Sequence, residues 1–321
     1  MRIDRRRALA LPLATLATPA LAQSWPQRPI RIVNPWPPGG PGDQIIRPIS
    51  AKLQESLGQP MVVENRAGAN GSLGANIVAT SPPDGYTLYF GHTGALTISP
   101  AVQPRLPYDP IRDFTPITRI LGQGSVLASR ASLPVTTAQE LIDYARTRPG
   151  EVNLGSIGIA STTHLFGEMI AAAAGIRFTH VPYTGAAPLV TDLLAGRVDI
   201  TLLGLPAVAP HIASGQVRAL AITSANPPRI APDMPTLNKT LPGFETESWY
   251  GMLGPANLPP EILAKLHREF AAAILSPDIS ALLVRDSYEP VGGTPEEFGA
   301  RIRHDLEAYR AIARRLELTV G

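Results

Sequence analysis

Apolar residues recur along the chain in two alternating patterns, short β-like runs and longer stretches with helical spacing. Residues 30–33 predict a strand, and the helix expected after residue 43 carries one apolar face made of Ile45, Ile46, Ile49, Leu53 and Leu57. Further strands are predicted at residues 61–64, 86–90 and 116–121, with a helix over 72–80. This alternation is typical of α/β layers around mostly parallel sheets.

A second series of the same kind begins near Val126. It predicts strands at residues 152–154, 178–181, 198–203 and 219–223, with helices over 137–148, 161–174 and 188–194. Thr137 and Glu140 have the spacing of a capping box, in which each side chain binds the other residue's backbone amide. The middle of the chain therefore predicts a sheet of its own.

After Pro-rich loops, residues 249–254 read as a strand that returns to the first unit. Helices are predicted over 259–275 and from a second capping box, Thr294 with Glu297, to about Leu316. We therefore expect residues 23–120 and 245–321 to form one domain and residues 121–244 the other. Two crossings, near 115–125 and 225–250, would form a hinge like that of binding proteins that close around a ligand.

The first 22 residues have the pattern of an export signal rather than of a fold. Arg2 and Arg5–Arg7 are followed by an apolar run and by Ala20-Leu21-Ala22, a small-residue cleavage pattern. The run is too short to span a bilayer, which takes roughly 20 residues. We expect cleavage after Ala22 and export, by either the general or the twin-arginine route.

Charge and cysteine content exclude several classes of function. Residues 1–22 hold four of the 28 basic residues and one of the 26 acidic ones, which leaves 24 against 25 and no global case for nucleic-acid binding. The chain has no cysteine, which excludes disulfides, thiolate metal sites, a cysteine nucleophile and a lipidated N-terminal cysteine. The remaining 299 residues are more than a single hydrophobic core usually accommodates, which favours two domains.

The loop at residues 34–43, Asn-Pro-Trp-Pro-Pro-Gly-Gly-Pro-Gly-Asp, is the most informative segment. A Gly-rich turn between strand and helix exposes backbone N–H groups at the helix N-terminus, where the helix dipole also favours an anion. The loop lacks the lysine and the glycine spacing of phosphate-binding loops, so we expect it to bind a carboxylate through uncharged backbone N–H groups. Asp43 either caps the helix or accepts a hydrogen bond from the ligand, and Pro48 predicts a kink.

Loops at the carboxyl ends of parallel strands commonly bind ligands, and several here are rich in Gly, Ser and Thr. If residues 37–43 and 155–164 lie on opposite domains, their helix N-termini would face each other across a cleft. Trp36 either walls that cleft or packs on a strand, and Tyr183 either reaches the cleft or packs. The expected ligand-binding residues are Trp36, Pro38, Gly39, Gly40, Asp43, His92, Thr93, Ser156, Ser161, Thr162, Tyr183, Gly204 and Leu205.

The sequence gives no support for a metal, a cofactor or catalysis. It has no HExxH or other paired-histidine spacing, no Gly-x-Ser-x-Gly, no P-loop and no dinucleotide-binding glycine pattern. Two functions other than simple ligand binding remain open. One is an exported serine-type hydrolase that uses Ser161 or Thr162 with His164. The other is a receptor that reports ligand occupancy to a membrane kinase.

Many short motifs, in order along residues 23–321, resemble the substrate-binding proteins of tripartite tricarboxylate transporters, also called Bug-type receptors. The motifs lie at residues 37–43, 63–68, 83–88, 106–114, 180–183, 218–221, 241–245 and 292–296. The resemblance implies a two-domain Venus-flytrap receptor in the periplasm. It also implies a monomer that delivers an organic acid to a membrane permease. In such proteins the loop matching 37–43 holds a carboxylate, partly through water, and loops matching 155–164 and 203–207 form the other wall.

Departures from the family pattern bear on the ligand. Many relatives have an Asp-Asn pair and a Ser where this chain has Leu203, Gly204 and Ala207, and many have Lys at Thr184. Asn34 and Trp36 replace the usual Val and Phe or Tyr. Because a charged acceptor and a cation are lost, we expect an acid with an apolar or aromatic body rather than a citrate-like one.

Overall fold

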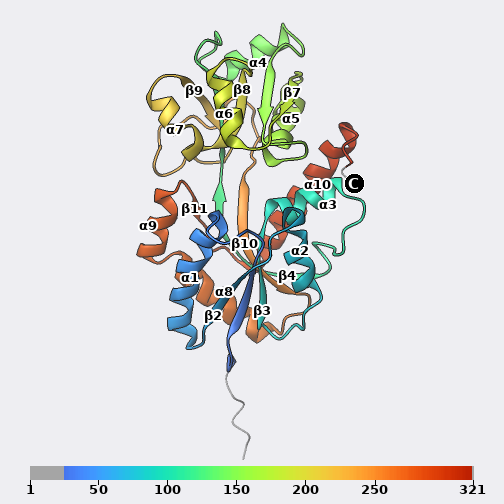
Figure 1. Ribbon diagram of the computed structural model, residues 1–321, viewed down its shortest axis with the longest axis vertical. Coiled ribbons are helices and arrows are strands. Elements are labelled where there is room, and N and C mark those ends of the chain that lie inside the picture. The colour runs from blue at the N-terminus through green and yellow to red at the C-terminus, as the bar shows by residue number, and fades with distance from the viewer. Residues whose placement is uncertain (1–24, 320–321) are drawn as a thin grey trace, which may run out of the picture.

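The computed structural model describes residues 25–319 and shows two units stacked along the long axis, each built on its own sheet (Figure 1). One sheet has six strands in the order β11-β4-β10-β3-β1-β2, and the other has five in the order β7-β6-β8-β5-β9. We call them the lower and upper units after their places in Figure 1. Export-signal residues 1–22 lie outside the described residues.

The lower unit contains both ends of the described chain. Its strands are β1 (Ile30–Asn34), β2 (Met61–Asn65), β3 (Thr87–His92), β4 (Phe114–Gln123), β10 (Ser248–Pro255) and β11 (Glu289–Pro290). Its helices are α1 (Pro41–Leu57), α2 (Ser72–Ala79), α3 (Ser99–Val102), α8 (Pro260–Ile274), α9 (Pro277–Arg285) and α10 (Pro295–Arg315), with short turns η1 (Ala69–Gly71) and η2 (Gly94–Ile98). β1 pairs in parallel with β2 and β3, whereas β10 runs antiparallel to β3 and β4.

The upper unit is the middle of the chain. Its strands are β5 (Ser125–Arg130), β6 (Asn153–Ser156), β7 (Thr179–Pro182), β8 (Ile200–Gly204) and β9 (Val217–Ile222). Its helices are α4 (Ala138–Arg146), α5 (Thr162–Ala174), α6 (Ala186–Leu194) and α7 (Leu205–Ala213), with the short turn η3 (Leu237–Lys239). β6 is parallel to β7 and β8, and β5 is antiparallel to β8 and β9. Both sheets are therefore mixed, with the strands that alternate with helices paired in parallel.

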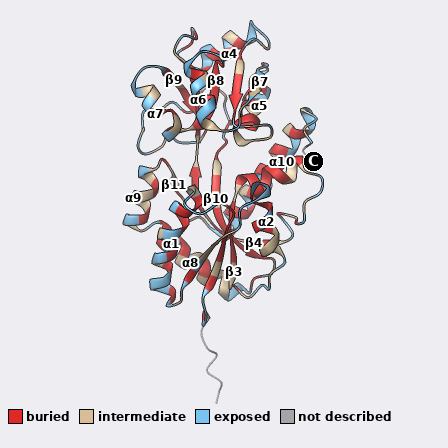
Figure 2. Ribbon diagram, viewed as in Figure 1, coloured by how far each residue is buried: buried red, intermediate tan, exposed pale blue. Residues whose placement is uncertain are grey.

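Local sequence signals account for most of these elements. The predicted apolar face of α1 is buried, with Ile46, Ile49 and Leu53 fully covered (Figure 2). The helix continues through Pro48. Thr294 and Glu297 form the complete capping box at the start of α10. At α4 the box is shifted, because Glu140 accepts from the backbone N–H of Thr136 rather than from that of Thr137.

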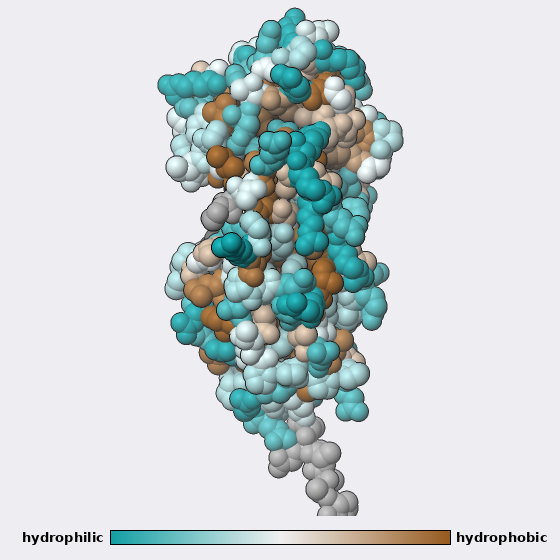
Figure 3. Space-filling view, turned by 90° about the vertical axis from the view of Figure 1, so that its right-hand side faces the viewer, coloured by the Kyte–Doolittle hydropathy of each residue, from teal (hydrophilic) through white to brown (hydrophobic). Residues whose placement is uncertain are grey.

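The chain changes sheet twice, at Gly124 and between β9 and β10. The units also touch through α10, whose Tyr309 ring stacks on Phe166 of α5 with centroids 6.4 Å apart. Arg315 donates to the backbone oxygen of Glu168 at 3.0 Å. Seen from the side that bears α10, the outline narrows where the units meet (Figure 3). Among the helices of residues 25–319, none has the length and hydrophobicity needed to cross a membrane.

Candidate functional site

Both units contribute residues to a cavity of about 190 Å³ that lies where they meet. The lower unit supplies residues from the loop after β1 and from η1, β3, η2 and β10, and the upper unit supplies the loop between β6 and α5 with the first residue of α5. The lining residues are Trp36, Asn70, His92, Thr93, Gly94, Ile98, Ile157, Ala160, Ser161, Thr162, Ser248, Trp249 and Tyr250. Five of the expected ligand-binding residues are in this set: Trp36, His92, Thr93, Ser161 and Thr162.

An aromatic cluster forms the lower wall. The Trp36 ring lies 4.6 Å from His92 and 5.1 Å from Tyr250, centroid to centroid, with Phe90 behind it at 5.5 Å. His92 Nδ1 accepts the Gly94 N–H at 3.1 Å, which orients the imidazole. Burial lowers the pKa of His92 to about 4, so the ring is neutral at pH 7. Trp36 thus both lines the cavity and packs on its own sheet.

The upper wall is the start of α5. Ser161 is the N-cap, and its hydroxyl accepts the His164 N–H at 3.3 Å. The Ile157 N–H donates to the Thr163 hydroxyl at 3.0 Å, which holds the loop against the N-terminus of α5. Within residues 25–319, the side-chain hydroxyls of Thr162 and Ser248 have no hydrogen-bond partner. Each unit therefore has at least one lining residue whose hydroxyl is uncommitted.

None of the thirteen lining residues is a charged side chain at pH 7. Hydroxyls, an amide and backbone N–H groups can hold one carboxylate, but no cation is present to neutralise a second one inside the cavity. Aromatic and aliphatic groups make up the rest of the lining, as in other small-molecule sites. Within residues 25–319, no group of three or more His, Asp and Glu residues is arranged so that it could bind a metal ion.

The prediction that the backbone N–H groups of residues 37–43 are free to bind a carboxylate is wrong for most of that loop. The Gly39 N–H donates to Asp43 at 2.8 Å, and the Gly40 and Asp43 amides donate to backbone oxygens within the loop. Of the backbone N–H groups between residues 36 and 44, only that of Gly42 has no acceptor within residues 25–319. The Trp36 ring lies against it, since a Cβ on Gly42 would be 2.5 Å from Trp36 Cε3.

Asp43 is not the N-cap of α1, because that position belongs to Gly40. Its carboxylate instead accepts from Asn34 and Asn65, each at 2.8 Å, and from Gly39, and it pairs with Arg47 at 3.1 Å. Burial alone would raise the pKa of Asp43, but these donors outweigh it and lower the pKa. Asp43 therefore orders the loop and has no free lone pair directed at a ligand.

The other expected site residues lie outside this cavity. Ser156 is buried, with its hydroxyl 2.6 Å from His180, and Tyr183 donates its hydroxyl to Asp192 of α6 at 2.8 Å. Gly204 is the N-cap of α7, beneath the Gln123 side chain. Pro38, Gly39 and Gly40 form the outer turn of their loop.

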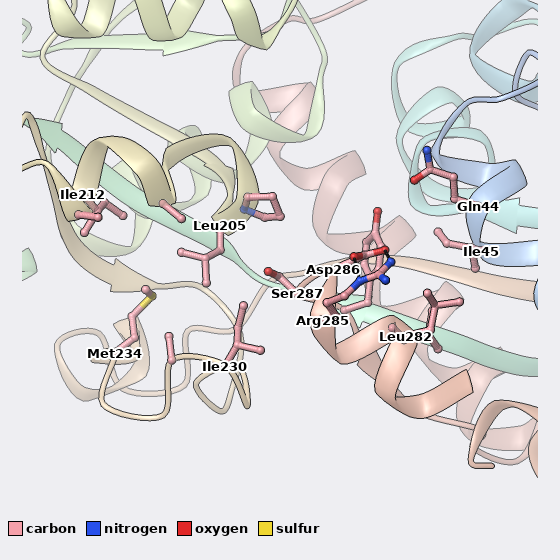
Figure 4. A pocket seen from close by; sticks show the side chains of 16 residues that line it. Gln44, Ile45, Leu205, Ile212, Ile230, Met234, Leu282, Arg285, Asp286 and Ser287 are labelled. Carbon is pink, nitrogen blue, oxygen red and sulfur yellow. Dashed lines mark hydrogen bonds and ion pairs between the residues drawn. The ribbon is translucent and has the colours of Figure 1, made fainter. Parts of the chain in front are cut away.

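Leu205 borders a second, larger cavity of about 680 Å³ between α7 in the upper unit and α1 and α9 in the lower unit. Figure 4 shows apolar side chains such as Ile212, Ile230 and Met234 facing Leu282 across this space. Its charged neighbours, Arg285 and Asp286, pair with each other at 2.9 Å. We place the site in the smaller cavity, because a carboxylate needs the donors that gather there.

Several lining residues were missed from the sequence. Ser248 and Tyr250 lie on β10, which reads only as a buried strand, and Asn70 lies in a turn. The search for ligand loops at the carboxyl ends of parallel strands could not find the β10 residues. β10 runs antiparallel to β3, so its first residues, and not its last, lie at the cavity. Ile157 and Ala160 lie inside the predicted loop, where apolar residues give no chemical signal.

Residues 45–318 match the family described as "Tripartite tricarboxylate transporter family receptor". This chain belongs to that family. A curated relative from Pseudomonas sp. (strain P51), the "UPF0065 protein in tcbD-tcbE intergenic region", is 37% identical over 97% of this chain and 94% of its own length.

Two solved structures place the fold. "R. palustris Rpa4515 with adipate" is 36% identical and superposes with a TM-score of 0.74 over 92% of this chain and 99% of its own. A "TctC solute binding protein from Polaromonas", solved with "no ligand", is 26% identical with a TM-score of 0.83 over 91% and 100%. The predicted family and two-unit α/β fold are therefore confirmed.

The protein is a solute-binding receptor, and it is not an enzyme, because its family consists of receptors. The site geometry agrees with this. The Ser161 hydroxyl donates to Gly158 O at 2.7 Å, and His164 Nδ1 accepts the Ala160 N–H at 3.2 Å, so the two side chains do not form a nucleophile–base pair. The hydrolase alternative is wrong.

Proposed function

We propose that this receptor captures a small organic carboxylate in the cavity between its units. The observation that supports this most directly is the pairing of two uncommitted hydroxyls, Thr162 from the upper unit and Ser248 from the lower. A carboxylate that accepts from both would join the units. The first two backbone N–H groups of α5 lie beside Thr162 and favour the same negative charge.

The chemistry of the lining favours an acid with an apolar body. Trp36, His92 and Tyr250 offer ring faces, and Ile157 lies across from them without any charged neighbour in the cavity. A relative of 36% identity was solved with adipate, whose two carboxylates are separated by a methylene chain. We propose an aliphatic or aromatic acid whose second charge, where it has one, extends toward the cavity mouth.

The two units would act as domains of a closing receptor. We propose boundaries near residues 120 and 245, so that the connections at Gly124 and before β10 form the hinge. Ligand shifts the open–closed equilibrium only by its differential affinity for the closed form, and contacts to both units provide that difference. We further propose export through residues 1–22, release into the periplasm as a monomer, and delivery to the membrane subunits of a tripartite transporter.

A thermal-shift screen tests the ligand class. The purified protein is mixed with adipate, benzoate, citrate and neutral amides of the first two acids. We expect stabilisation by adipate or benzoate and none by citrate or the amides, because the cavity offers donors for one carboxylate and no cation. Stabilisation by citrate alone would overturn the proposed ligand class, and stabilisation by the amides would overturn carboxylate recognition.

A matched pair of tryptophan variants places the site. Trp36→Leu removes the ring from the cavity wall, whereas Trp25→Leu removes one that packs on Tyr86, away from it. We expect only Trp36→Leu to abolish the ligand-induced shift. Equal loss in both variants would mean that the cavity does not hold the ligand. Uptake of the stabilising acid in a deletion strain, restored by the gene, tests delivery.

A further inference from the structure

Two histidines of the upper unit stack face to face behind the cavity wall. The rings of His164 on α5 and His180 on β7 are nearly parallel, 7° apart, with centroids separated by 3.6 Å. His164 is buried, with 5% of its surface exposed. Neither ring lines the cavity, and the ligand-binding role assigned above uses neither.

Each ring holds part of the loop that does line the cavity. His164 Nδ1 accepts the Ala160 N–H at 3.2 Å, and a nitrogen that accepts a hydrogen bond carries no proton. Ala160 has a φ of +56°, a left-handed conformation that alanine rarely adopts and that the surrounding bonds must hold. His180 Nε2 lies 2.6 Å from the Ser156 hydroxyl, which also bonds to Gly158.

We propose that His164 and His180 are positioning residues that hold the loop between β6 and α5 in its binding conformation, and that a proton on His164 Nδ1 releases it. This inference rests on the proposed function for the loop's role in binding. The proton would point an N–H at the Ala160 N–H, so the bond is lost and Ala160 is free to leave its strained conformation. Ala160 and Thr162 would then lose their places in the cavity wall.

Within residues 25–319, the charged groups on the elements around the pair have partners of their own. Glu168, one turn along α5, pairs with Arg315 of α10 at 3.3 Å, and Tyr183 at the end of β7 bonds to Asp192 of α6. β6 and β8 carry no charged residue within their spans, and Tyr309 of α10 faces Phe166. Burial, and then the charge of His180, lower the pKa of His164 to about 4, and burial lowers that of His180.

The sign of the pH effect follows from these directions. Since the pKa of His164 in the folded protein lies below its ordinary value of 6.5, the neutral pair persists from neutral pH down to about pH 4. Below that, the proton binds and the loop is released. Ligand binding should therefore be insensitive to His164 near pH 7 and become sensitive to it in acid.

Nuclear magnetic resonance of the purified, unliganded protein tests the coupling directly. We expect the His164 ring to titrate near pH 4 and the Ala160 amide shift to follow the same midpoint. His164→Asn places an amide oxygen near the position of Nδ1 but cannot titrate, so it should keep the Ala160 shift and remove its pH dependence. His304→Asn, whose side chain is 73% exposed, is the matched control and should change neither.

Calorimetric titration with adipate and with benzoate adds the functional readout. Affinity of the wild type relative to His164→Asn should be unchanged at pH 7 and about twofold lower at pH 4, where a group of pKa about 4 is half protonated. The ratio cancels protonation of the ligand itself. A His164 midpoint near 6.5, or an Ala160 amide that ignores the titration, would overturn the proposal. If neither acid binds at pH 7, the proposed function fails. The resonance data would still show whether protonation of His164 is coupled to the Ala160 amide.

Discussion

At the scale of single residues, hydrogen bonds fix the conformation of the loop after β1. Asn34 and Asp43 lock the turn after β1 through a buried amide–carboxylate bond of 2.8 Å. The amide of Asn34 gives the carboxylate a donor that an apolar residue at this position would not provide. The turn therefore supports Trp36 rather than binding a ligand with its own amides.

Asp43→Asn tests this role. An amide in place of the carboxylate puts an NH₂ group against the donors that now converge on Asp43, so we expect a loss of about 2 kcal/mol in the free energy of unfolding. Urea unfolding at pH 7 measures it. Because the pKa of Asp43 is lowered, its contribution to stability should also fade as pH drops below 3.8. A variant as stable as the wild type would contradict the assignment.

Thr162→Val tests the hydroxyl on the upper wall. The substitution keeps the shape of the side chain and removes its donor, so affinity for a stabilising acid should fall about tenfold, from the loss of about 1 to 1.5 kcal/mol. Thr191→Val, on α6, is the control and should bind normally. Calorimetry provides the affinities, and an unchanged value for Thr162→Val would place the carboxylate elsewhere.

At the scale of elements, helix starts were the most readable feature of the sequence. Thr294 caps α10 as expected, and Ser161, where a helix was predicted to start, is the N-cap of α5. α7 and α9 were not predicted, although α1, α8 and α10, which also begin with proline, were. α7 includes Pro206 and Pro210, and α9 begins at Pro277. Packing of α7 against β5, β8 and β9 maintains it despite the lost hydrogen bonds.

Thr294→Ala tests the contribution of the capping box to α10. It removes the acceptor for the Glu297 N–H and should lower the free energy of unfolding by about 1 kcal/mol. Thr294→Ser keeps the hydroxyl and should cost much less. Urea unfolding of both variants decides the matter, and an equal loss in the two would show that the methyl group, not the cap, is responsible.

For the whole molecule, the proposed closing mechanism depends on the connections that hold the two units together. Glu247 lies just before β10, at the second connection, where it pairs with Arg119 of β4 and, at 3.2 Å, with Arg301 of α10. Burial raises the pKa of Glu247 against the opposing pull of these two arginines. This network ties one connection between the units to the lower unit.

Glu247→Gln should destabilise the protein by about 3 kcal/mol, because it leaves the largely buried guanidinium of Arg119 without its counter-charge, whereas Arg301 keeps Glu245 and Asp305. Thermal unfolding measures the loss. Glu289→Gln, whose partner Arg229 is exposed, is the control and should change stability by less than about 1 kcal/mol. Similar effects from both would mean that the network at Glu247 is no more important than a surface pair.

Small-angle scattering tests closure of the whole molecule. With a saturating acid, the radius of gyration should decrease if the ligand holds the units together. Thr162→Val should need more of the acid to reach the same value, because its change lies only in affinity. A radius unaffected by a ligand that binds would overturn the closing mechanism and leave a receptor with a fixed cavity.

The sequence by itself determined the succession of strands and helices, the division into two series and the family, because periodicity, caps and short motifs are local properties. It also located the loop before α5 and the residues Trp36, His92 and Thr93. Only the tertiary structure decided which amides are free, since the side chain of Asp43 and the turn's own backbone oxygens accept from the amides of Gly39, Gly40 and Asp43. It alone brought Ser248 and Tyr250 of β10 to the cavity and stacked His164 on His180, because strand pairing sets contacts between residues far apart in the chain.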